Sequence, residues 1–387
     1  MKIKAKINII MLCVLYFMSF LSYALPYGYM QTFLAYVGYD VLERGMILSG
    51  CALVAIVLQF FVGYLCDKFK TDKWFYNILI ALFALSSYIM YAISEKNFFV
   101  HLIFISLLGG LERSCEAVQD AWCLETDEDC KDNYGAIRAF GAIGWMIGSP
   151  IAAWIIETKG YPSIGLVFAL LCVVNIVITF FMKDATKVEK KEGKISFADI
   201  KKLLMNRRFI LVTAMFLIVN IIAMADSYTV VDKMLALHAS ESTIGARWSI
   251  QAFMELPLFF AGAWLLKKFD DYKLMVFGTI MYVLRFVLYA LVQTPEWMIV
   301  VSLLQGITFP LIMITSKTLV DNATPIELRA SGQTIASSIY IGVSMLIAPT
   351  LAGVLASMVG LDLTLAIFGL SGLLVLVLGK FYKKAQE

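Results

Sequence analysis

The residues most able to do chemistry are charged side chains that lie inside long apolar stretches. One stretch, residues 99–124, contains Glu112, Arg113, Glu116 and Asp120. A charge at the centre of a bilayer costs about 2.5–3.5 kcal/mol on insertion scales, so such residues normally face a polar cavity or a partner. The three acids are spaced i, i+4 and i+8, which places their carboxylates along one helical face. Arg113 can pair with Glu116, but the other carboxylates of this stretch then have no cation to pair with.

The next apolar stretch, residues 134–158, carries Arg138 about one turn from its start. In consecutive antiparallel helices Asp120 and Arg138 meet across the interface, either as a structural ion pair or as the lining of a hydrophilic cavity. Trp145 follows Arg138 by two helical turns and so shares its face. An aromatic ring beside polar groups suits a sugar or another ring-shaped solute, although a tryptophan also packs in cores or faces lipid. We expect Asp120, Arg138 and Trp145 to bind substrate.

Charged residues also occur inside the apolar stretches of the second half. Glu255 is flanked by apolar residues and precedes Pro257, and it can either carry a proton or be held ionised by Arg285. We expect Glu255 to contact the substrate as well. Asp232 is expected at the outer interface, paired with Lys233. The residues that could carry a coupled proton are Glu255, Asp226, Glu116, Glu112 and Arg285.

Twelve apolar stretches are long enough to position these residues as membrane-spanning helices, each of which needs about 20 residues. They fall near 8–36, 45–66, 74–94, 99–124, 134–158, 162–182, 208–236, 243–266, 272–292, 297–320, 328–355 and 360–381. The sequence therefore predicts an all-α membrane protein of twelve transmembrane helices in two six-helix, pseudo-symmetric halves, residues 1–182 and 208–387. Residues 183–207 form a polar cytoplasmic linker, with a short amphipathic helix at 196–205.

The basic residues of the loops predict the orientation. The first apolar stretch follows Lys2, Lys4 and Lys6 and resembles a signal peptide, but further spans follow directly, so we interpret it as the first transmembrane helix. Lys and Arg are retained on the cytoplasmic side, which places both termini and the linker in the cytoplasm of a cell-membrane protein. That side collects Lys2, Lys4, Lys6, Lys68, Lys70, Lys73, Lys131, Lys267, Lys268, Lys273, Arg329, Lys380, Lys383 and Lys384, against Arg44, Lys96, Lys159 and Lys233 opposite.

Small residues and prolines recur at matched positions of the two halves. They allow helices to approach closely and to bend, so they fit ordinary tight packing or a duplicated transporter core. The fifth span contains Gly135, Gly141, Gly144, Gly148 and Pro150, and the eleventh contains Ser331, Gly332, Ser337, Ser338, Gly342 and Pro349.

The loop after the second span carries a family signature. Its pattern is G-x-x-x-D-K-x-x-x-x-K, from Gly63 through Asp67 and Lys68 to Lys73, with a degraded counterpart at 262–273. It resembles the loop motif of the major facilitator superfamily. Gly63 should permit close helix approach, and Asp67 should cap or pair with a neighbouring helix end.

A narrower resemblance covers residues 120–145. The run Asp120-Ala121, followed by Tyr134-Gly135-Ala136-Ile137-Arg138 and continuing to Trp145, resembles the oligosaccharide:proton symporters, the lactose permease-like family. The resemblance implies that Asp120, Arg138 and Trp145 contact a sugar.

The sequence departs from this family in its second half. Glu255 and Arg285 match the family's helix 8 glutamate and helix 9 arginine only loosely. Gln305 and Thr308 stand where the family has a histidine and a glutamate on helix 10. Neither titrates near neutral pH, so a coupled proton must be carried elsewhere.

Composition narrows the function class. Hydrophobic residues make up 60% of the 387 residues and the net charge is +3, which argues against a nucleic-acid-binding protein. With two histidines, scattered cysteines and no nucleotide-binding motif, we expect no enzyme activity, cofactor or metal. We expect a monomeric secondary transporter of a small polar solute, driven by a proton gradient. The alternatives are a drug or metabolite exporter, a membrane-embedded enzyme and a non-transporting sensor.

Overall fold

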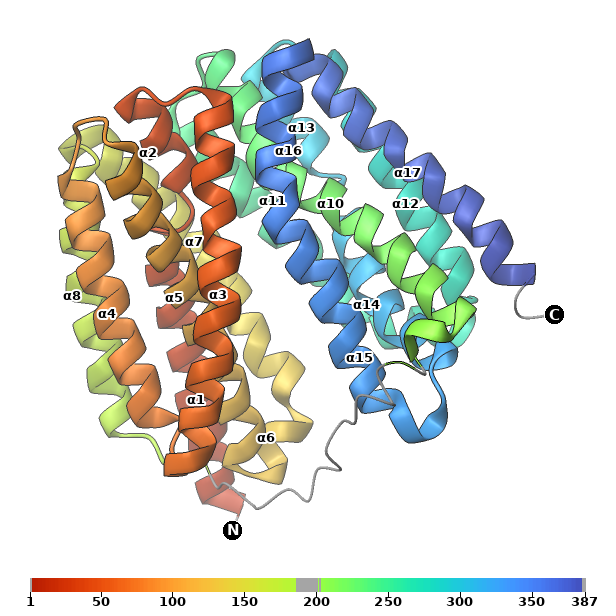
Figure 1. Ribbon diagram of the computed structural model, residues 1–387. Helices are drawn as coiled ribbons and strands as arrows, with labels where there is room; N and C mark the ends of the chain where they lie inside the picture. Colours follow the sequence, from red (N-terminus) through yellow and green to blue (C-terminus); the bar gives the residue numbers. More distant parts are fainter. Residues whose placement is uncertain (1, 186–200, 202, 385–387) are drawn as a thin grey trace. The chain divides into compact units, whose positions relative to one another are not determined.

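The computed structural model describes residues 2–185, 201 and 203–384, and every regular element in that part of the chain is helical (Figure 1). The predicted helix at 196–205 falls mainly outside these residues. The first group of helices is α1 (Lys2–Tyr23), α2 (Met30–Val37), α3 (Val41–Phe69), α4 (Lys73–Ala92), α5 (Phe98–Thr126), α6 (Glu128–Asp132), α7 (Tyr134–Lys159) and α8 (Pro162–Phe180). The second is α10 (Arg207–Ala236), α11 (Glu241–Lys268), α12 (Asp271–Leu291), α13 (Pro295–Ser302), α14 (Gln305–Ala323), α15 (Arg329–Ser337), α16 (Ser344–Val359) and α17 (Leu361–Lys384).

Among the described residues, eleven helical segments are long and apolar enough to cross a membrane. They coincide with eleven of the twelve predicted stretches to within a few residues at most ends. The remaining stretch, 243–266, is the middle of the 28-residue helix α11. This helix is less apolar because Arg247, Gln251 and Glu255 lie within it. The chain is an all-α, multi-pass membrane protein.

The helices form two compact units. Unit 1 comprises residues 1–190 with 239–253, and unit 2 comprises residues 191–238 with 254–387. The first turns of α11 thus group with the N-terminal helices, and the remainder of α11 groups with the C-terminal ones. The division into two six-helix halves at residues 182 and 208 stays a prediction.

The first predicted stretch is not one helix. It breaks after Tyr23 and resumes as α2 at Met30, which corrects the predicted continuous span at 8–36. Pro26 and Gly28 lie in the break, and the Pro26 carbonyl accepts a hydrogen bond from the Tyr91 hydroxyl at 2.6 Å. The prediction missed this turn because apolarity alone extended across it, whereas proline and glycine are the residues that interrupt helices.

The predicted tenth and eleventh spans also carry interruptions. The tenth consists of α13 and α14, separated at residues 303–304. The eleventh contains one turn of π-helix, Ser338–Val343, between α15 and α16. Gly342 lies in this turn, and a π turn inside an α-helix is a frequent feature of functional regions.

Three glycines of α7 set how closely it packs on α1. A Cβ built on Gly144 would lie 2.2 Å from the Phe17 carbonyl oxygen, and one on Gly148 would lie 2.4 Å from the Leu21 carbonyl oxygen. A Cβ built on Gly141 would lie 2.9 Å from a ring carbon of Phe20. The predicted close approach is therefore confirmed at these glycines, and it fixes the part of α7 that carries Arg138 and Trp145.

The loop ends of α3 and α11 repeat one another in the two units. The Lys68 ammonium lies 5.8 Å from the ring centre of Tyr64, and that of Lys268 lies 4.9 Å from the ring centre of Trp264. The spacing of lysine and aromatic residue is the same in both helices, which supports the predicted duplication. At Gly63, however, a Cβ would meet nothing within 4 Å, so the predicted close helix approach there is wrong.

Candidate functional site

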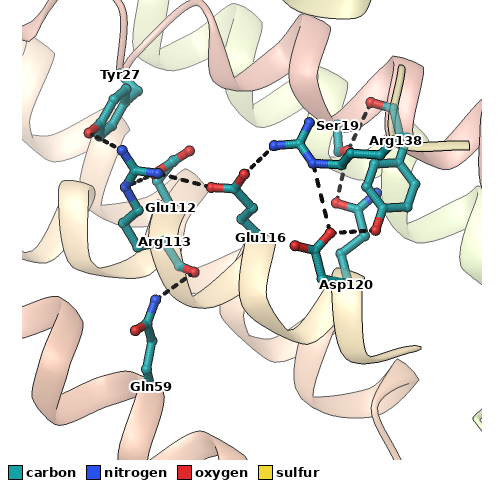
Figure 2. Close-up of polar contacts among 10 residues, drawn as sticks. Ser19, Tyr27, Gln59, Glu112, Arg113, Glu116, Asp120 and Arg138 are labelled. Atoms are coloured by element: carbon teal, nitrogen blue, oxygen red, sulfur yellow. Dashed lines mark hydrogen bonds and ion pairs between the residues drawn. The ribbon is translucent and has the colours of Figure 1, made fainter. Parts of the chain in front are cut away.

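The charged residues of α5 and α7 form a single chain of alternating charge within unit 1 (Figure 2). Arg138 Nε lies 3.9 Å from Asp120 Oδ1, and Arg138 also forms a short ion pair with Glu116. Arg113 NH1 donates to Glu116 Oε2 at 3.1 Å, and Arg113 Nε lies 3.5 Å from Glu112 Oε2. Glu116 is therefore bound by both arginines. The i, i+4, i+8 spacing brings the three carboxylates onto one face of α5, as predicted.

Aromatic and hydroxyl groups of α1 hold the Asp120 end of the chain. The Tyr16 hydroxyl donates to Asp120 Oδ1 at 2.6 Å, and the Arg138 guanidinium lies 4.2 Å from the ring centre of Phe20. Behind them, Ser19 donates to the Gln119 side chain at 3.1 Å. Because the α7 glycines let α1 approach closely, the rings of α1 reach Arg138. Asp120 and Arg138 still expose 30% and 31% of their side chains, so a solute can reach them.

Trp145 lies near the other end of the charged chain. Its ring meets Tyr27 edge to face, with ring centres 6.3 Å apart, and the Tyr27 hydroxyl accepts a hydrogen bond from Arg113 at 3.4 Å. Trp145 thus joins the site through Tyr27. Tyr27 was not predicted as a site residue, and its signal in the sequence is its place between Pro26 and Gly28, in the turn after α1.

Glu112 is the least exposed of the three acids in this network. Its side chain is 4% exposed, against 17% for Glu116 and 30% for Asp120. Among the described residues Glu112 Oε2 has no hydrogen-bond partner, and neither has Arg113 Nε, the nitrogen nearest to it. The contact between Glu112 and Arg113 is therefore an ion pair without hydrogen-bond geometry.

Unit 2 contains a separate network centred on Arg285. This residue is fully buried on α12, and its NH2 donates to Asp226 Oδ1 on α10 at 2.7 Å. Arg285 NH1 donates to the Gln305 side-chain oxygen and, at 3.2 Å, to the Thr308 hydroxyl. The Gln305 amide in turn donates to Glu255 Oε1 at 2.6 Å. The structure therefore brings Asp226, Arg285 and Glu255 together, with Gln305 as the bridge.

The bridging role of Gln305 was not predicted. From the sequence, Gln305 and Thr308 were notable only because neither side chain titrates. A polar residue directly before Gly306 in an apolar stretch was the available signal, since a buried amide needs partners for both its oxygen and its nitrogen.

The predicted pair of Asp232 and Lys233 is wrong. Lys233 Nζ instead lies 2.7 Å from Asp362 Oδ1 on α17 and donates to the carbonyl oxygens of Tyr289 and Ala290. The Lys233 side chain is directed toward α12 and α17 rather than toward Asp232. Lys233 joins α10, the end of α12 and the start of α17.

Arg247 is a further buried charge, and it was not predicted as a site residue. It lies on α11 in unit 1, is fully buried, and its guanidinium lies 4.7 Å from the ring centre of Trp248. Its signal was plain, an arginine inside the predicted span 243–266.

The loop motif lines a cavity at one end of unit 1. The cavity measures about 240 Å³ and is lined by Gly63, Asp67, Asp72 and Glu125, among others. At this end of α5, Asp127 precedes the short helix α6. It accepts hydrogen bonds from the Asn8 amide and the Cys130 backbone, both at 2.8 Å. Burial by itself would raise the pKa of Asp127, but these hydrogen bonds outweigh it and hold the pKa below its ordinary value.

Similar proteins of known function are transporters rather than enzymes. A maltose permease of Geobacillus stearothermophilus is 22% identical over 271 residues, which are 68% of this chain and 65% of the permease, just under two thirds of its length. A crystal structure of the nucleoside transporter NupG superposes with a TM-score of 0.81 at 16% identity, over 98% of this chain and 100% of that one. A POT family transporter solved with a thioalcohol-conjugated peptide superposes with a TM-score of 0.74 at 15% identity, over 97% of this chain and 96% of that one.

The sequence itself matches the MFS_1 like family over residues 9–375, nearly its whole length. The structural likenesses agree with this match in fold. The chain belongs to the MFS_1 like family and has the fold of the solved transporters that it resembles.

Proposed function

We propose that this protein is a secondary carrier that uses the energy of a proton gradient to move a small hydroxylated solute, a sugar or a nucleoside. Asp120, Arg138 and Trp145 of unit 1 bind the solute, and Glu255 of unit 2 is a further substrate-binding residue. The carrier works by alternating access, in which substrate and proton bind differently to two conformations.

The single observation that carries this proposal is the partial exposure of Asp120 and Arg138 within helices long enough to span a membrane. A charge facing lipid is strongly disfavoured, so a charged pair with about a third of its surface accessible faces a polar space. The pair offers a carboxylate that accepts from hydroxyl groups and a guanidinium that donates to them. The Trp145 ring, which meets Tyr27 edge to face, supplies an apolar surface for a ring of the solute.

The relatives favour the same class of solute. The permease is named for maltose and the structural neighbour for nucleosides, and both kinds of molecule combine a ring with several hydroxyl groups. We propose a shared chemistry, not a shared substrate.

The proposed orientation follows from the loop charges. We infer that both termini and the linker lie in the cytoplasm and that the protein resides in the cell membrane as a monomer. Reporter fusions at Lys96 and after Lys384 test this: only the second should be accessible from the cytoplasm.

Uptake by purified protein in liposomes tests the function. Labelled sugars and nucleosides are offered with a pH gradient, acidic outside, and with an uncoupler. The proposal predicts saturable uptake that the uncoupler reduces and that Arg138→Ala lowers to the level of empty liposomes while the variant still inserts. The control Lys131→Ala alters an exposed basic residue of α6 and should transport normally. Drug resistance without sugar or nucleoside uptake would identify an exporter instead, and undiminished transport by Arg138→Ala would refute the role of Arg138.

A further inference from the structure

We propose that Glu112 is the residue that binds the coupled proton, and that the chain of alternating charge links it to the substrate end at Asp120 and Arg138. This inference rests on the proposed function. It locates the proton on α5 of unit 1, about two helical turns from Asp120, and it assigns Gln305 and Thr308 no part in proton binding.

The acids and bases of this network are unequal in number. The chain contains three carboxylates, Glu112, Glu116 and Asp120, and two guanidinium groups, Arg113 and Arg138 (Figure 2). When every group is ionised, one negative charge is in excess. A bound proton on one carboxylate makes the chain neutral, so the question is which carboxylate takes it.

The three carboxylates differ in the hydrogen bonds that they receive. Glu116 is bound by both arginines, and Asp120 receives the Tyr16 hydroxyl at 2.6 Å in addition to Arg138. Within the part of the chain that the structure describes, the only ion-pair partner of Glu112 is Arg113 Nε at 3.5 Å, without hydrogen-bond geometry, and the Glu112 side chain is 4% exposed. A buried carboxylate without hydrogen bonds is the most costly to keep ionised, so Glu112 is the acid that a proton stabilises most.

Several titratable and charged side chains surround Glu112. The titratable and charged groups near it are Tyr27 from the turn after α1, Cys51 from α3, Arg138 from α7, and Arg113, Cys115 and Glu116 from α5 itself. Arg113 is the only cation of this set in ion-pair contact with it among the described residues, and Arg113 is also shared with Glu116 and with the Tyr27 hydroxyl.

The shared arginines explain how proton and substrate affect one another. When Glu112 is ionised, it competes for Arg113, and Glu116 then depends more on Arg138. When Glu112 is protonated, Arg113 binds Glu116 fully, and Arg138 becomes available to donate to a substrate. Proton and substrate therefore favour each other's binding, and this effect is reciprocal because it is a coupling free energy.

The test separates exchange from accumulation. Glu112→Gln keeps the shape of a protonated carboxyl, so we expect it to exchange labelled for unlabelled substrate across liposomes without a gradient, within about twofold of the native protein. It should not accumulate substrate against a concentration difference. With one proton per substrate, a gradient of about one pH unit supports about tenfold accumulation by the native protein. With Glu112→Gln, the internal substrate concentration should rise only to the external concentration.

Three further measurements fix the interpretation. Glu116→Gln removes the central link, so it should lose both exchange and accumulation, and the exposed Glu128→Gln should lose neither. Native exchange should fall with rising pH, whereas Glu112→Gln exchange should be independent of pH. If Glu112→Gln fails to insert, Glu112→Asp decides, because it keeps the acid in an altered position and should accumulate substrate with a displaced pH profile.

Tenfold accumulation by Glu112→Gln, or an unchanged pH profile in Glu112→Asp, would overturn the assignment of Glu112. Failure of the native protein itself to accumulate any substrate with a pH gradient would instead overturn the proposed function. The two failures are thus distinguishable.

Discussion

Replacing Gly144 by alanine is expected to separate α7 from α1 and to damage the site. The added Cβ would lie 2.2 Å from the Phe17 carbonyl oxygen and 2.9 Å from the Leu21 nitrogen. Ordinary van der Waals contact begins near 3.4 Å, so the two helix backbones must move apart by about 1.2 Å, the difference between 3.4 and 2.2. Both obstacles are backbone atoms of a helix and cannot turn aside as a side chain does.

The expected magnitude follows from that displacement. Overpacking of a core costs about 1–3 kcal/mol, and an unyielding backbone places Gly144→Ala at the upper end. The gain in helix propensity from glycine to alanine returns about 1 kcal/mol. The net loss of about 2 kcal/mol corresponds to a fall in Tm of about 4–8 °C for a unit of this size. A shift of about 1 Å between Arg138 and the rings of α1 should reduce transport by about 100-fold.

The assay is thermal unfolding in detergent together with uptake in liposomes. Gly135→Ala is the matched control, because Gly135 lies on the same helix and a Cβ there meets nothing within 4 Å. It should keep both its Tm and its transport. Equal behaviour of the two variants would refute the claim that helix approach at Gly144 builds the site.

Two further predictions concern unit 2 and the α5–α7 loop. Gln305→Leu leaves Arg285 and Glu255 without the bridging amide. Because hydrogen bonds to charged groups contribute about 1.5–3 kcal/mol each, this variant should lower the Tm by several degrees. The control Gln293→Leu removes an exposed amide contact and should barely change the Tm. The pKa of Asp127 is lowered in the folded state, so its stabilising effect is present above the unfolded pKa of about 3.9 and is lost as the pH falls through the folded pKa. Asp127→Asn should therefore flatten the fall in Tm that the native protein shows below about pH 4, and a fall as steep as the native one would contradict the role given to Asp127.

The fold was predictable because membrane helices are defined by length and apolarity. Spans such as 99–124 and 134–158 recur as α5 and α7 with shifts of one or two residues. The errors lie where a break leaves apolarity unchanged. The turn at Pro26 and Gly28 and the division before Gln305 are local backbone events, and an apolar window extends across both.

The candidate site was predictable in part, for a related reason. Helical periodicity placed Glu112, Glu116 and Asp120 on one face, and antiparallel neighbours brought Arg138 to them. Periodicity carries no information on contacts from helices distant in sequence. The roles of Tyr16 and Tyr27, and the Gln305 bridge, depend on such contacts and could be found only in the structure.

The central claim, that solute and proton cross the membrane together through this carrier, is tested most directly by measuring proton movement on addition of solute. Liposomes containing the native protein, with no initial pH gradient, receive a sugar or nucleoside that the uptake screen has identified, and a dye reports the external pH. We predict that the external medium becomes more alkaline as solute and proton enter together, and that Glu112→Gln abolishes this change. Solute entry by the native protein without any change in external pH would contradict the account.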